Sequence, residues 1–343
     1  MMMTTKYNVA IVGVGGVVGE AVLSLLADRD FPLGTLYALD AAVIEAGRVE
    51  FRDGYVPVRN VADFDFSQAQ LAFFCAGEAL AAQHVPRAAA AGCVVIDDSA
   101  QFRYEEDVPL VVPEVNAEAI AQYRRRGIIA NPNSCVTLLL VALKAIYDAV
   151  GVERINVVTF QAVSGTGKMA MDELATQTMS IFNMKGISTK VYPKQIAFNV
   201  LPMVGEVLEN GFTREEMKML WETRKILADE AVQVNASCVR VPVFFGHSQA
   251  VHIETRDKIT AAAARQLLEK SPGIKLVDRR KAGAFPTAVT EAVGADAVYV
   301  GRLREDLSHP RGLDLWIVAD NVRKGAALNS IQIAEILVKD YLS

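Results

Sequence analysis

The chain has few of the features that mark disulfide-rich, metal-binding, membrane-spanning or nucleic-acid-binding proteins. Only four cysteines occur in 343 residues. They show neither C-x-x-C spacing nor a histidine at metal-ligand spacing. No uninterrupted apolar run is long enough to cross a bilayer. Lysine and arginine are scattered, apart from short clusters at 124–126 and 279–281 that are typical of solvated surface. We therefore predict no metal, no membrane association and no nucleic-acid partner.

A secretory leader is also missing from the first residues. The segment "MMMTTKYNVAIVG" has no charged start followed by a long apolar core and passes directly into a strand-like run. Three of the cysteines lie inside apolar strand-like runs and are interpreted as buried thiols, whereas Cys135 alone follows a turn. We expect a protein of the reducing cytoplasm.

The composition that is present describes an ordinary globular protein. Hydrophobic residues make up 52% of the chain and charged residues 22%, with a net charge of -5. A chain of this length suits two domains, each large enough to bury a core.

The first part of the chain alternates strand-like and helix-like runs. Near-continuous Val, Ile and Ala strands joined through helices indicate a parallel sheet covered on both faces. The expected strands are 7–13, 35–40, 71–77, 93–99 and 127–131, and the expected helices are 17–29, 78–91 and 116–125.

After about residue 150 the strands become longer, and the pattern indicates a mixed sheet with helices on one face. The last segment, 322–341, has apolar residues at helical spacing. The expected strands of this part are 154–165, 236–245, 248–255, 297–304 and 313–320, and the helices are 167–184, 213–228 and 260–270.

A glycine-rich turn between the first expected strand and helix is typical of a dinucleotide-binding loop. Gly13, Gly16 and Gly19 follow the spacing G-x-x-G-x-x-G, and such glycines let a pyrophosphate approach backbone N–H groups. The next strand ends in Asp40. A carboxylate there accepts hydrogen bonds from a ribose 2′-hydroxyl and repels a 2′-phosphate, so these residues favour NAD over NADP. The alternative is that Asp40 only caps a strand end.

Polar residues elsewhere interrupt apolar segments. "IIANPN" leads into Ser134 and Cys135 at the start of a helical pattern, where a helix N-terminus can stabilise an anionic nucleophile. Arg240 lies inside an apolar strand, which is costly unless the guanidinium pairs with a carboxylate or phosphate. His247 follows Gly246, and we expect it to be exposed and to act as an acid or base rather than to fill the core.

The sequence resembles the aspartate-semialdehyde dehydrogenase family over nearly its whole length. Several segments in the family's order make the resemblance specific. They are the glycine loop at 13–19, "FRYEEDVPLVVPEVN" (102–116), "ANPN" (130–133), "SGTGK" (164–168), "QIAFNVLP" (195–202), "TREEMKMLWETRKIL" (213–227), "CVRVPVFFGHS" (238–248) and "LWIVADNVRKGAALN" (315–329).

The resemblance implies an α/β protein that reduces aspartyl 4-phosphate to aspartate semialdehyde with NADPH, on the route to lysine, methionine and threonine. It implies an N-terminal Rossmann-type parallel sheet, here residues 1–132 plus 321–343. A second α+β domain, residues 133–320, would resemble the C-terminal domain of glyceraldehyde-3-phosphate dehydrogenase and would carry catalysis and dimerisation. We therefore expect a homodimer acting on a small-molecule substrate.

The resemblance also implies roles for single residues in binding the substrate. Arg103 matches the arginine that binds the substrate phosphate, and Lys218 matches a lysine that assists it. Arg240 matches the arginine that binds the carboxylate, and Glu215 matches the acid that holds the amino group. Asn133 belongs to the same substrate-binding set.

Further positions match the family's catalytic and cofactor-binding residues. Gln161 matches the glutamine that orients the substrate beside the nucleophile, and His247 matches the acid/base. Asn321 matches a nicotinamide contact. The complete set expected to bind the cofactor is Gly13, Gly15, Gly16, Val17, Val18, Asp40, Ser164, Gly165 and Asn321.

Two departures from the family's pattern bear on mechanism. The family's nucleophile motif reads Asn-Cys-Ser or Asn-Cys-Thr, but here Ser134 occupies the cysteine position. Because a hydroxyl needs stronger activation than a thiol, we predict Cys135 as a nucleophile shifted by one residue. Successive helical residues differ by about 100°, so the first turn would have to be re-registered. The alternative is a catalytically silent paralogue that keeps the fold and nucleotide pocket for binding or regulation.

The second departure is the loop "DAAVIEAGR" (40–48). NADP-binding members carry Ser and Arg residues there for the 2′-phosphate, and this loop offers only Arg48. NADP, which the family uses, and NAD both remain open.

Overall fold

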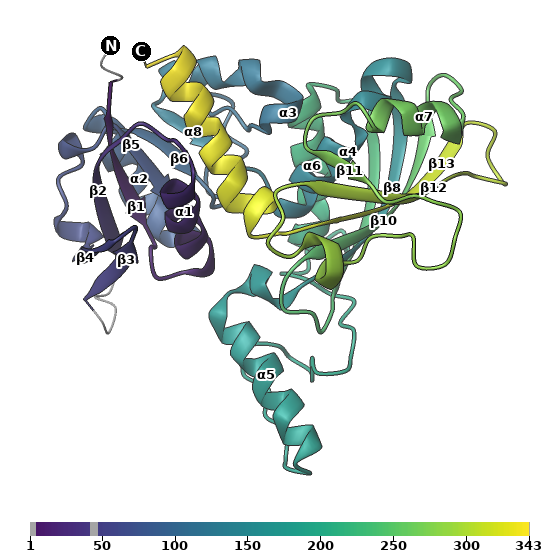
Figure 1. The fold of residues 1–343 in the computed structure, drawn as a ribbon, viewed down its shortest axis with the longest axis horizontal. Coiled ribbons are helices and arrows are strands. Elements are labelled where there is room, and N and C mark those ends of the chain that lie inside the picture. Colours follow the sequence, from purple (N-terminus) through teal and green to yellow (C-terminus); the bar gives the residue numbers. More distant parts are fainter. Residues whose placement is uncertain (1–4, 42–46, 343) are drawn as a thin grey trace. The chain divides into compact units, whose positions relative to one another are not determined.

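The computed structural model describes residues 5–41 and 47–342. The chain divides into two compact units, residues 1–133 with 326–343 and residues 134–325 (Figure 1). We call them unit 1 and unit 2. Relative to the sequence-based division, Asn133 lies in unit 1 and residues 321–325 lie in unit 2.

Unit 1 contains a seven-stranded sheet in the order β3-β4-β2-β1-β5-β6-β7. All its pairings are parallel except the β3–β4 hairpin. The expectation of a Rossmann-type parallel sheet is confirmed. The strands are β1 (Tyr7–Val12), β2 (Leu33–Asp40), β3 (Arg48–Phe51), β4 (Gly54–Asn60), β5 (Leu71–Phe74), β6 (Val94–Asp97) and β7 (Ile128–Ala130).

Helices cover the sheet of unit 1. α1 (Val17–Asp28) packs against α8 (Leu328–Asp340), and α2 (Glu78–Ala90) packs on β5 and β6. The C-terminal helix belongs to this unit because Ile331, Ala334 and Leu337 are buried in its core. The helix begins later than the pattern predicted, since Arg323–Ala327 forms a π-helical turn before it.

Unit 1 contains one element that the sequence did not predict and one that differs from its prediction. The β3–β4 hairpin was not predicted, because its strands are short and largely solvent-facing. The expected helix 116–125 is instead the short α3 (Pro113–Asn116) followed by a 3₁₀ segment, Ala117–Arg125.

Unit 2 contains a six-stranded mixed sheet in the order β11-β12-β13-β10-β8-β9. α4 (Ser134–Val150), α6 (Arg214–Leu227) and α7 (Ala261–Leu268) pack on one face of it. The expectation of helices on one face is met by the segments 213–228 and 260–270, whereas the expected helix 167–184 has a small core of its own. α4, α6 and α7 leave the opposite face of the sheet open, and we call it the helix-free face; its side chains include Val158, Phe160 and Trp316. The strands are β8 (Val152–Gln161), β9 (Gln233–Arg240), β10 (His247–Thr255), β11 (Ile274–Leu276), β12 (Val298–Glu305) and β13 (Gly312–Ala319).

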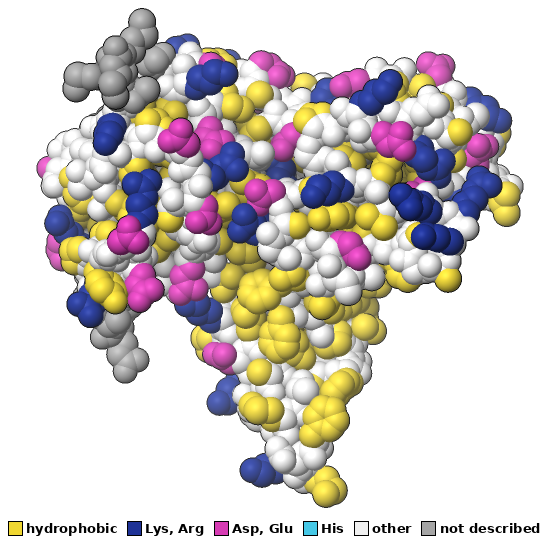
Figure 2. Space-filling model, in the orientation of Figure 1, with side chains coloured by type: hydrophobic (Ala, Val, Ile, Leu, Met, Phe, Trp, Pro, Cys, Tyr) yellow, Lys and Arg dark blue, Asp and Glu magenta, His cyan; other side chains and the backbone are white. Residues whose placement is uncertain are grey.

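An arm built on α5 (Lys168–Phe182) projects from the rest of unit 2 (Figure 1). Its own small core joins Ala170 and Leu174 to residues 196–201. Figure 2 shows hydrophobic side chains on this arm, where Phe182 and Met184 are exposed. Within residues 5–41 and 47–342, none of the helices has the length and apolar character that a membrane crossing needs.

Candidate active site

Three of the predicted site residues meet at one end of the sheet in unit 2. Gln161 and Arg240 are the last residues of the parallel strands β8 and β9 and lie directly opposite each other. His247 is the first residue of β10, which runs antiparallel to β8 and therefore starts at the same end. All three side chains are buried. Sheet topology thus brings an amide, a guanidinium and an imidazole together from distant parts of the sequence.

Helix α6 adds two charged side chains to this cluster. Thr213 and Glu216 form a capping box that fixes where the helix begins. Glu215 in the first turn accepts a hydrogen bond from Gln161 Nε2 at 3.3 Å, and its other oxygen lies 3.2 Å from Lys218 Nζ. The Glu215 carboxylate therefore connects the strand-end amide to the Lys218 ammonium group. We call Gln161, Glu215, Lys218, Arg240 and His247 the strand-end cluster.

Arg240 has a donor available within this cluster. The residue is only 6% exposed, and Nη1 donates to the carbonyl oxygen of Ala162 at 2.7 Å. Its Nε is buried and has no hydrogen-bond partner among the described residues. A buried guanidinium with an unused donor is suited to binding a carboxylate or a phosphate.

His247 is buried, so the prediction that it is exposed was wrong. Its exposed fraction is 1%, because alternate residues of β10 face the helices and His247 shares that face with Val251 and Ile253. Nδ1 accepts a hydrogen bond from the Ala162 N–H at 3.1 Å. Burial, followed by the nearby Arg240 charge, lowers the pKa of His247 to about 3. The ring is therefore neutral at pH 7 and carries its proton on Nε2.

A hydrogen-bonded pair supports the turn before His247. Asn321 accepts from the Gly246 N–H at 2.9 Å, and its amide nitrogen donates to Ser164 Oγ at 3.0 Å. Gly165 follows in close contact with Arg240 and His247, since a Cβ built on it would lie 3.2 Å from Arg240 Nη1 and 3.4 Å from His247 Nε2. Ser164, Gly165 and Asn321 are thus part of the framework around the cluster.

The start of α4 separates the two candidate nucleophiles. Ser134 is the first residue of the helix and is half-buried, whereas Cys135 is completely buried. A Cβ on Gly325 would lie 2.8 Å from Ser134 Cβ, so Gly325 leaves room for that side chain. Burial raises the pKa of the Cys135 thiol well above its usual range. In this conformation the thiol is neutral and buried, whereas a shifted nucleophile has to be exposed to the substrate.

The glycine loop of unit 1 has the geometry of a phosphate-binding turn. Gly13 has φ +82°, and a Cβ there would meet the Cys75 carbonyl oxygen at 2.7 Å. A Cβ on Gly19 would lie 2.2 Å from the Gly13 oxygen, which no side chain could tolerate. Gly16 is the N-cap of α1, and Val17 and Val18 begin the helix. These residues fit a dinucleotide pyrophosphate at the helix N-terminus.

Asp40 is hydrogen-bonded to this loop. One carboxylate oxygen accepts from the Gly15 N–H at 3.1 Å and the other accepts from Ala41 N–H at 2.8 Å. It therefore closes its own strand end while remaining beside the loop. Part of the following segment, residues 42–46, lies outside the described residues. Arg48 lies over the Tyr55 ring, 4.2 Å from its centroid.

Arg103 and Asn133, the remaining predicted substrate residues, are both buried in unit 1. Arg103 Nη2 donates to the Asp98 carbonyl oxygen at 2.7 Å. The adjacent Asp97 is fully buried, and burial raises its pKa to about 6. Asp97 and Asp98 were not predicted as site residues. Their position at the end of an apolar parallel strand was a signal, because ligands bind at that edge of such sheets.

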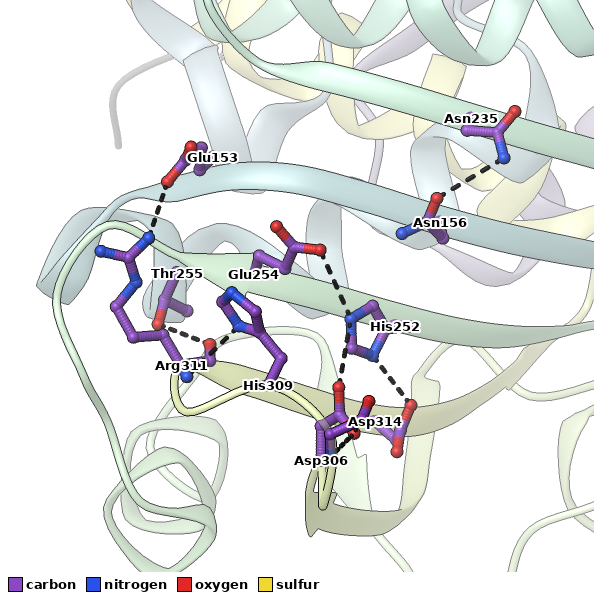
Figure 3. A network of polar contacts seen from close by, with 11 residues as sticks. Glu153, Asn156, Asn235, His252, Glu254, Thr255, Asp306, His309, Arg311 and Asp314 are labelled. Atoms are coloured by element: carbon purple, nitrogen blue, oxygen red, sulfur yellow. Dashed lines mark hydrogen bonds and ion pairs between the residues drawn. The ribbon is translucent and has the colours of Figure 1, made fainter.

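A polar network on the helix-free face of unit 2 was also missed (Figure 3). His252 Nδ1 lies 3.1 Å from Asp314 Oδ1, and its Nε2 lies 3.7 Å from Asp306 and 4.0 Å from Glu254. Within the described ranges, no group of three or more His, Cys, Asp or Glu side chains is arranged to hold a metal ion. The network is therefore a set of polar contacts at a sheet surface.

Comparison with known families gives the class of protein that this fold and site define. Residues 8–123 match the model described as "Semialdehyde dehydrogenase, NAD binding domain". Residues 143–324 match "Semialdehyde dehydrogenase, dimerisation domain". The chain is thus a semialdehyde dehydrogenase by class, with a nicotinamide-dinucleotide-binding domain and a dimerisation domain.

Individual relatives define the family more closely. The chain is 53% identical over 340 residues to an aspartate-semialdehyde dehydrogenase of Legionella pneumophila, covering 99% of this chain and 98% of that protein. The crystal structure of Vibrio cholerae aspartate semialdehyde dehydrogenase II complexed with ASA superposes with a TM-score of 0.96 at 52% identity, covering 98% and 99%. A Pseudomonas aeruginosa structure, described as a probable aspartate-semialdehyde dehydrogenase, gives 0.93 at 36% identity, covering 98% and 100%. The chain belongs to the aspartate-semialdehyde dehydrogenase family of oxidoreductases, as the sequence motifs predicted.

Proposed function

We propose that this protein catalyses the reaction between aspartyl 4-phosphate and aspartate semialdehyde with a nicotinamide cofactor. The single observation that carries the proposal is the strand-end cluster. Buried charged residues are costly in a folded protein unless they are paired, and a substrate with a carboxylate and an ammonium group supplies partners for them. The cluster therefore has a composition that matches the amino-acid end of this substrate.

Each charged group of the cluster has a proposed task. Arg240 binds the α-carboxylate through its unused Nε, and Glu215 binds the α-ammonium group. Gln161 holds Glu215 and orients the substrate. Lys218 binds the phosphate. The phosphate-binding role of Arg103 stays a prediction from the family resemblance. These assignments are supported by the charge of each group and by the hydrogen bonds of Glu215.

His247 is proposed as a proton donor. Its Nδ1 already accepts the Ala162 N–H, so the neutral ring presents Nε2–H. A donor of this kind stabilises negative charge that develops on an acyl oxygen or on departing phosphate. Because burial lowers the pKa of His247, the group stays in this form across the neutral range.

The covalent step requires a nucleophile that displaces phosphate and is then released as the aldehyde forms. The nicotinamide group supplies the hydride. We propose Cys135 for the displacement, through a thioester, since a thiolate is much the better nucleophile. With Ser134 at the open start of α4, this requires the first turn to shift by one residue and expose the thiol.

A second candidate function is favoured by the burial of Cys135. If the first turn of α4 stays as it is, the thiol remains neutral and inaccessible. The protein would then bind the amino-acid substrate and the nucleotide without turnover. This second candidate is a binding or regulatory paralogue.

One assay separates the two functions. Phosphate-dependent oxidation of aspartate semialdehyde is followed for the wild type, Cys135→Ala and Ser134→Cys, with NADP and NAD in parallel. Wild-type turnover that is abolished in Cys135→Ala supports the proposed reaction. Turnover that appears only in Ser134→Cys establishes the binding paralogue instead, and failure to bind either nucleotide rejects both.

The same assay decides the cofactor. NADPH is proposed because the family uses it, and the glycine loop accepts the pyrophosphate common to both cofactors. Asp40 beside Gly15 would repel a 2′-phosphate. The ratio of kcat/KM for NADP to that for NAD shows whether the protein uses NADP like its family or prefers NAD because of Asp40. Asp40→Ser should shift that ratio toward NADP.

We further propose a homodimer formed through unit 2. The match of residues 143–324 to a dimerisation domain supports it. The helix-free sheet face carries exposed Val158 and the ring of Trp316, and apolar side chains on an open sheet face are suited to a protein interface.

A further inference from the structure

A cavity of about 640 Å³ lies between β12 and the segment 278–285 of unit 2. Cationic side chains dominate its lining: Arg265, Arg279, Arg280, Lys281, Arg302 and Arg304. Asp278 is the one carboxylate among the residues that line it. We call this cavity the basic cleft, and it shares no residue with the strand-end cluster.

The Asp278 carboxylate is already engaged and does not neutralise the cleft. It accepts hydrogen bonds from Arg265 Nε at 3.0 Å and from the Leu303 N–H at 3.2 Å. Arg304 Nη2 lies 3.4 Å from a carboxylate oxygen of Asp314, a residue that does not line the cleft. No ion pair between Arg279, Arg280, Lys281 or Arg302 and a carboxylate is found in the described part of the chain. Four exposed cations thus face one cavity without a matching negative charge.

The segment that carries Arg279, Arg280 and Lys281 is fixed against the sheet. Val277 N–H donates to the Val300 carbonyl oxygen at 2.9 Å, and Trp316 Nε1 donates to the Pro286 carbonyl oxygen at 3.0 Å. Between these anchors, Gly301 allows close packing, since a Cβ there would lie 2.5 Å from both Pro286 Cδ and the Val277 oxygen. Arg279, Arg280 and Lys281 therefore lie on a loop held at both ends, and Arg302 lies on β12. This arrangement lowers the entropy lost when a ligand binds.

The backbone of β12 is also unusual beside the cleft. Arg302 has φ +55°, a left-handed conformation that side chains other than glycine rarely adopt. It lies where the β12–β13 register shifts between Gly301 and Arg304. Backbone strain of this kind tends to occur at functional positions. The irregularity places the side chain of Arg302 in the lining of the cleft.

We propose that the basic cleft is a second ligand site, which binds a small polyanion carrying several phosphate groups. Arginine forks bind phosphate oxygens through paired, charge-assisted hydrogen bonds, so three neighbouring arginines and a lysine match a chain of phosphates. The volume exceeds what one phosphate fills and falls within the range of small-molecule sites. Inorganic polyphosphate and a nucleoside triphosphate share this chemistry.

The test is calorimetric titration of inorganic tripolyphosphate into the full-length protein. Three proteins are compared: the wild type, Arg279→Gln/Arg280→Gln, and the control Arg124→Gln/Arg125→Gln, which removes two adjacent arginines from unit 1. All four positions lie in loop or 3₁₀ segments. Circular dichroism verifies that each variant is folded.

We expect one binding event that weakens at least tenfold in Arg279→Gln/Arg280→Gln and is unchanged in the control. It should also weaken as salt rises, because exposed charges are screened. Equal affinity in the two double variants, or no binding by the wild type at low salt, overturns the proposal. ATP that displaces tripolyphosphate from this event identifies the nucleoside form as a ligand, and absence of displacement assigns the cleft to inorganic polyphosphate. Because turnover is not measured, the outcome is independent of the proposed reaction.

Discussion

At the scale of single residues, the mechanism depends on which of two neighbours begins α4 in the accessible position. Ser134 holds the half-buried first position and Cys135 is completely buried. The two side chains differ by one step of a helix, about 100° around its axis. A shift this small would exchange an inert hydroxyl for a potential thiolate, so the chemistry depends on the first turn rather than on the fold.

The reactivity of Cys135 is the first prediction. A thiol that is buried and has a raised pKa should react slowly with an aromatic disulfide reagent, because the thiolate is the reacting species. We expect no fast phase from Cys135 in the native protein, and four equivalents after unfolding, which equals the number of cysteines. A fast equivalent that is missing from Cys135→Ala would show that the first turn opens in solution.

The neutral form of His247 gives a second prediction at this scale. Its pKa is lowered from 6.5 to about 3 in the folded protein, so the unfolded chain binds more protons between these values and stability falls as pH falls through that window. The loss of stability due to His247 is absent above pH 6.5 and complete below pH 3. His247→Gln should remove roughly 3 kcal/mol of the loss between pH 6.5 and about 4.

Urea unfolding at several pH values measures this difference. Both tryptophans, Trp221 and Trp316, lie in unit 2 with His247, so their fluorescence reports the relevant transition. An identical pH dependence for the wild type and His247→Gln would mean that the imidazole titrates normally and is not buried as a neutral donor.

At the scale of elements, the strand-end cluster depends on where strands end and where one helix begins. β8, β9 and β10 deliver Gln161, Arg240 and His247 to one edge of the sheet. The cap of α6 then sets the position of Glu215 and Lys218. Local changes at the cap should therefore affect ligand binding as well as stability.

Removal of that cap is the third prediction. Thr213→Ala loses the hydrogen bond from the Glu216 N–H and should lower the free energy of unfolding by about 1 kcal/mol. Thr260→Ala removes the corresponding bond from Ala263 at α7 and provides a matched control. Both variants should lose similar stability in urea, but only Thr213→Ala should weaken aspartate semialdehyde binding. Equal affinity in the two would show that α6 does not position the site.

The elements also show what the sequence could predict. Apolar runs and helical spacing identified the buried strands of unit 1 and helices α4 to α7, because those patterns arise directly from burial. The β3–β4 hairpin was missed because Val49 and Phe51 alternate with exposed residues over four positions only. In the site, the residues that take part could be predicted from the chemistry of their side chains. The burial of these side chains could not be predicted. His247 faces inward through its register with Val251 and Ile253, and the start of α4 leaves Cys135 inside the core; both depend on how elements pack.

At the scale of the whole molecule, the proposed assembly uses the sheet face that α4, α6 and α7 leave open. Val158→Asp places a charge in the middle of that face, where burial against a second copy would be costly. Val293→Asp, at an exposed residue outside the strands, serves as the control. Light scattering should give a dimer for the wild type and Val293→Asp, and a monomer for Val158→Asp. A dimeric Val158→Asp would place the interface elsewhere.

The central claim is that the strand-end cluster of unit 2 binds the amino-acid end of aspartate semialdehyde. Its most direct test is the dissociation constant of aspartate semialdehyde, measured by calorimetry for the wild type, Arg240→Leu and the exposed-site control Arg154→Leu. Loss of a buried guanidinium–carboxylate contact should weaken binding at least tenfold, or about 1.4 kcal/mol or more, with the control unchanged. Equal affinity in all three proteins, or no binding by the wild type, would contradict the claim.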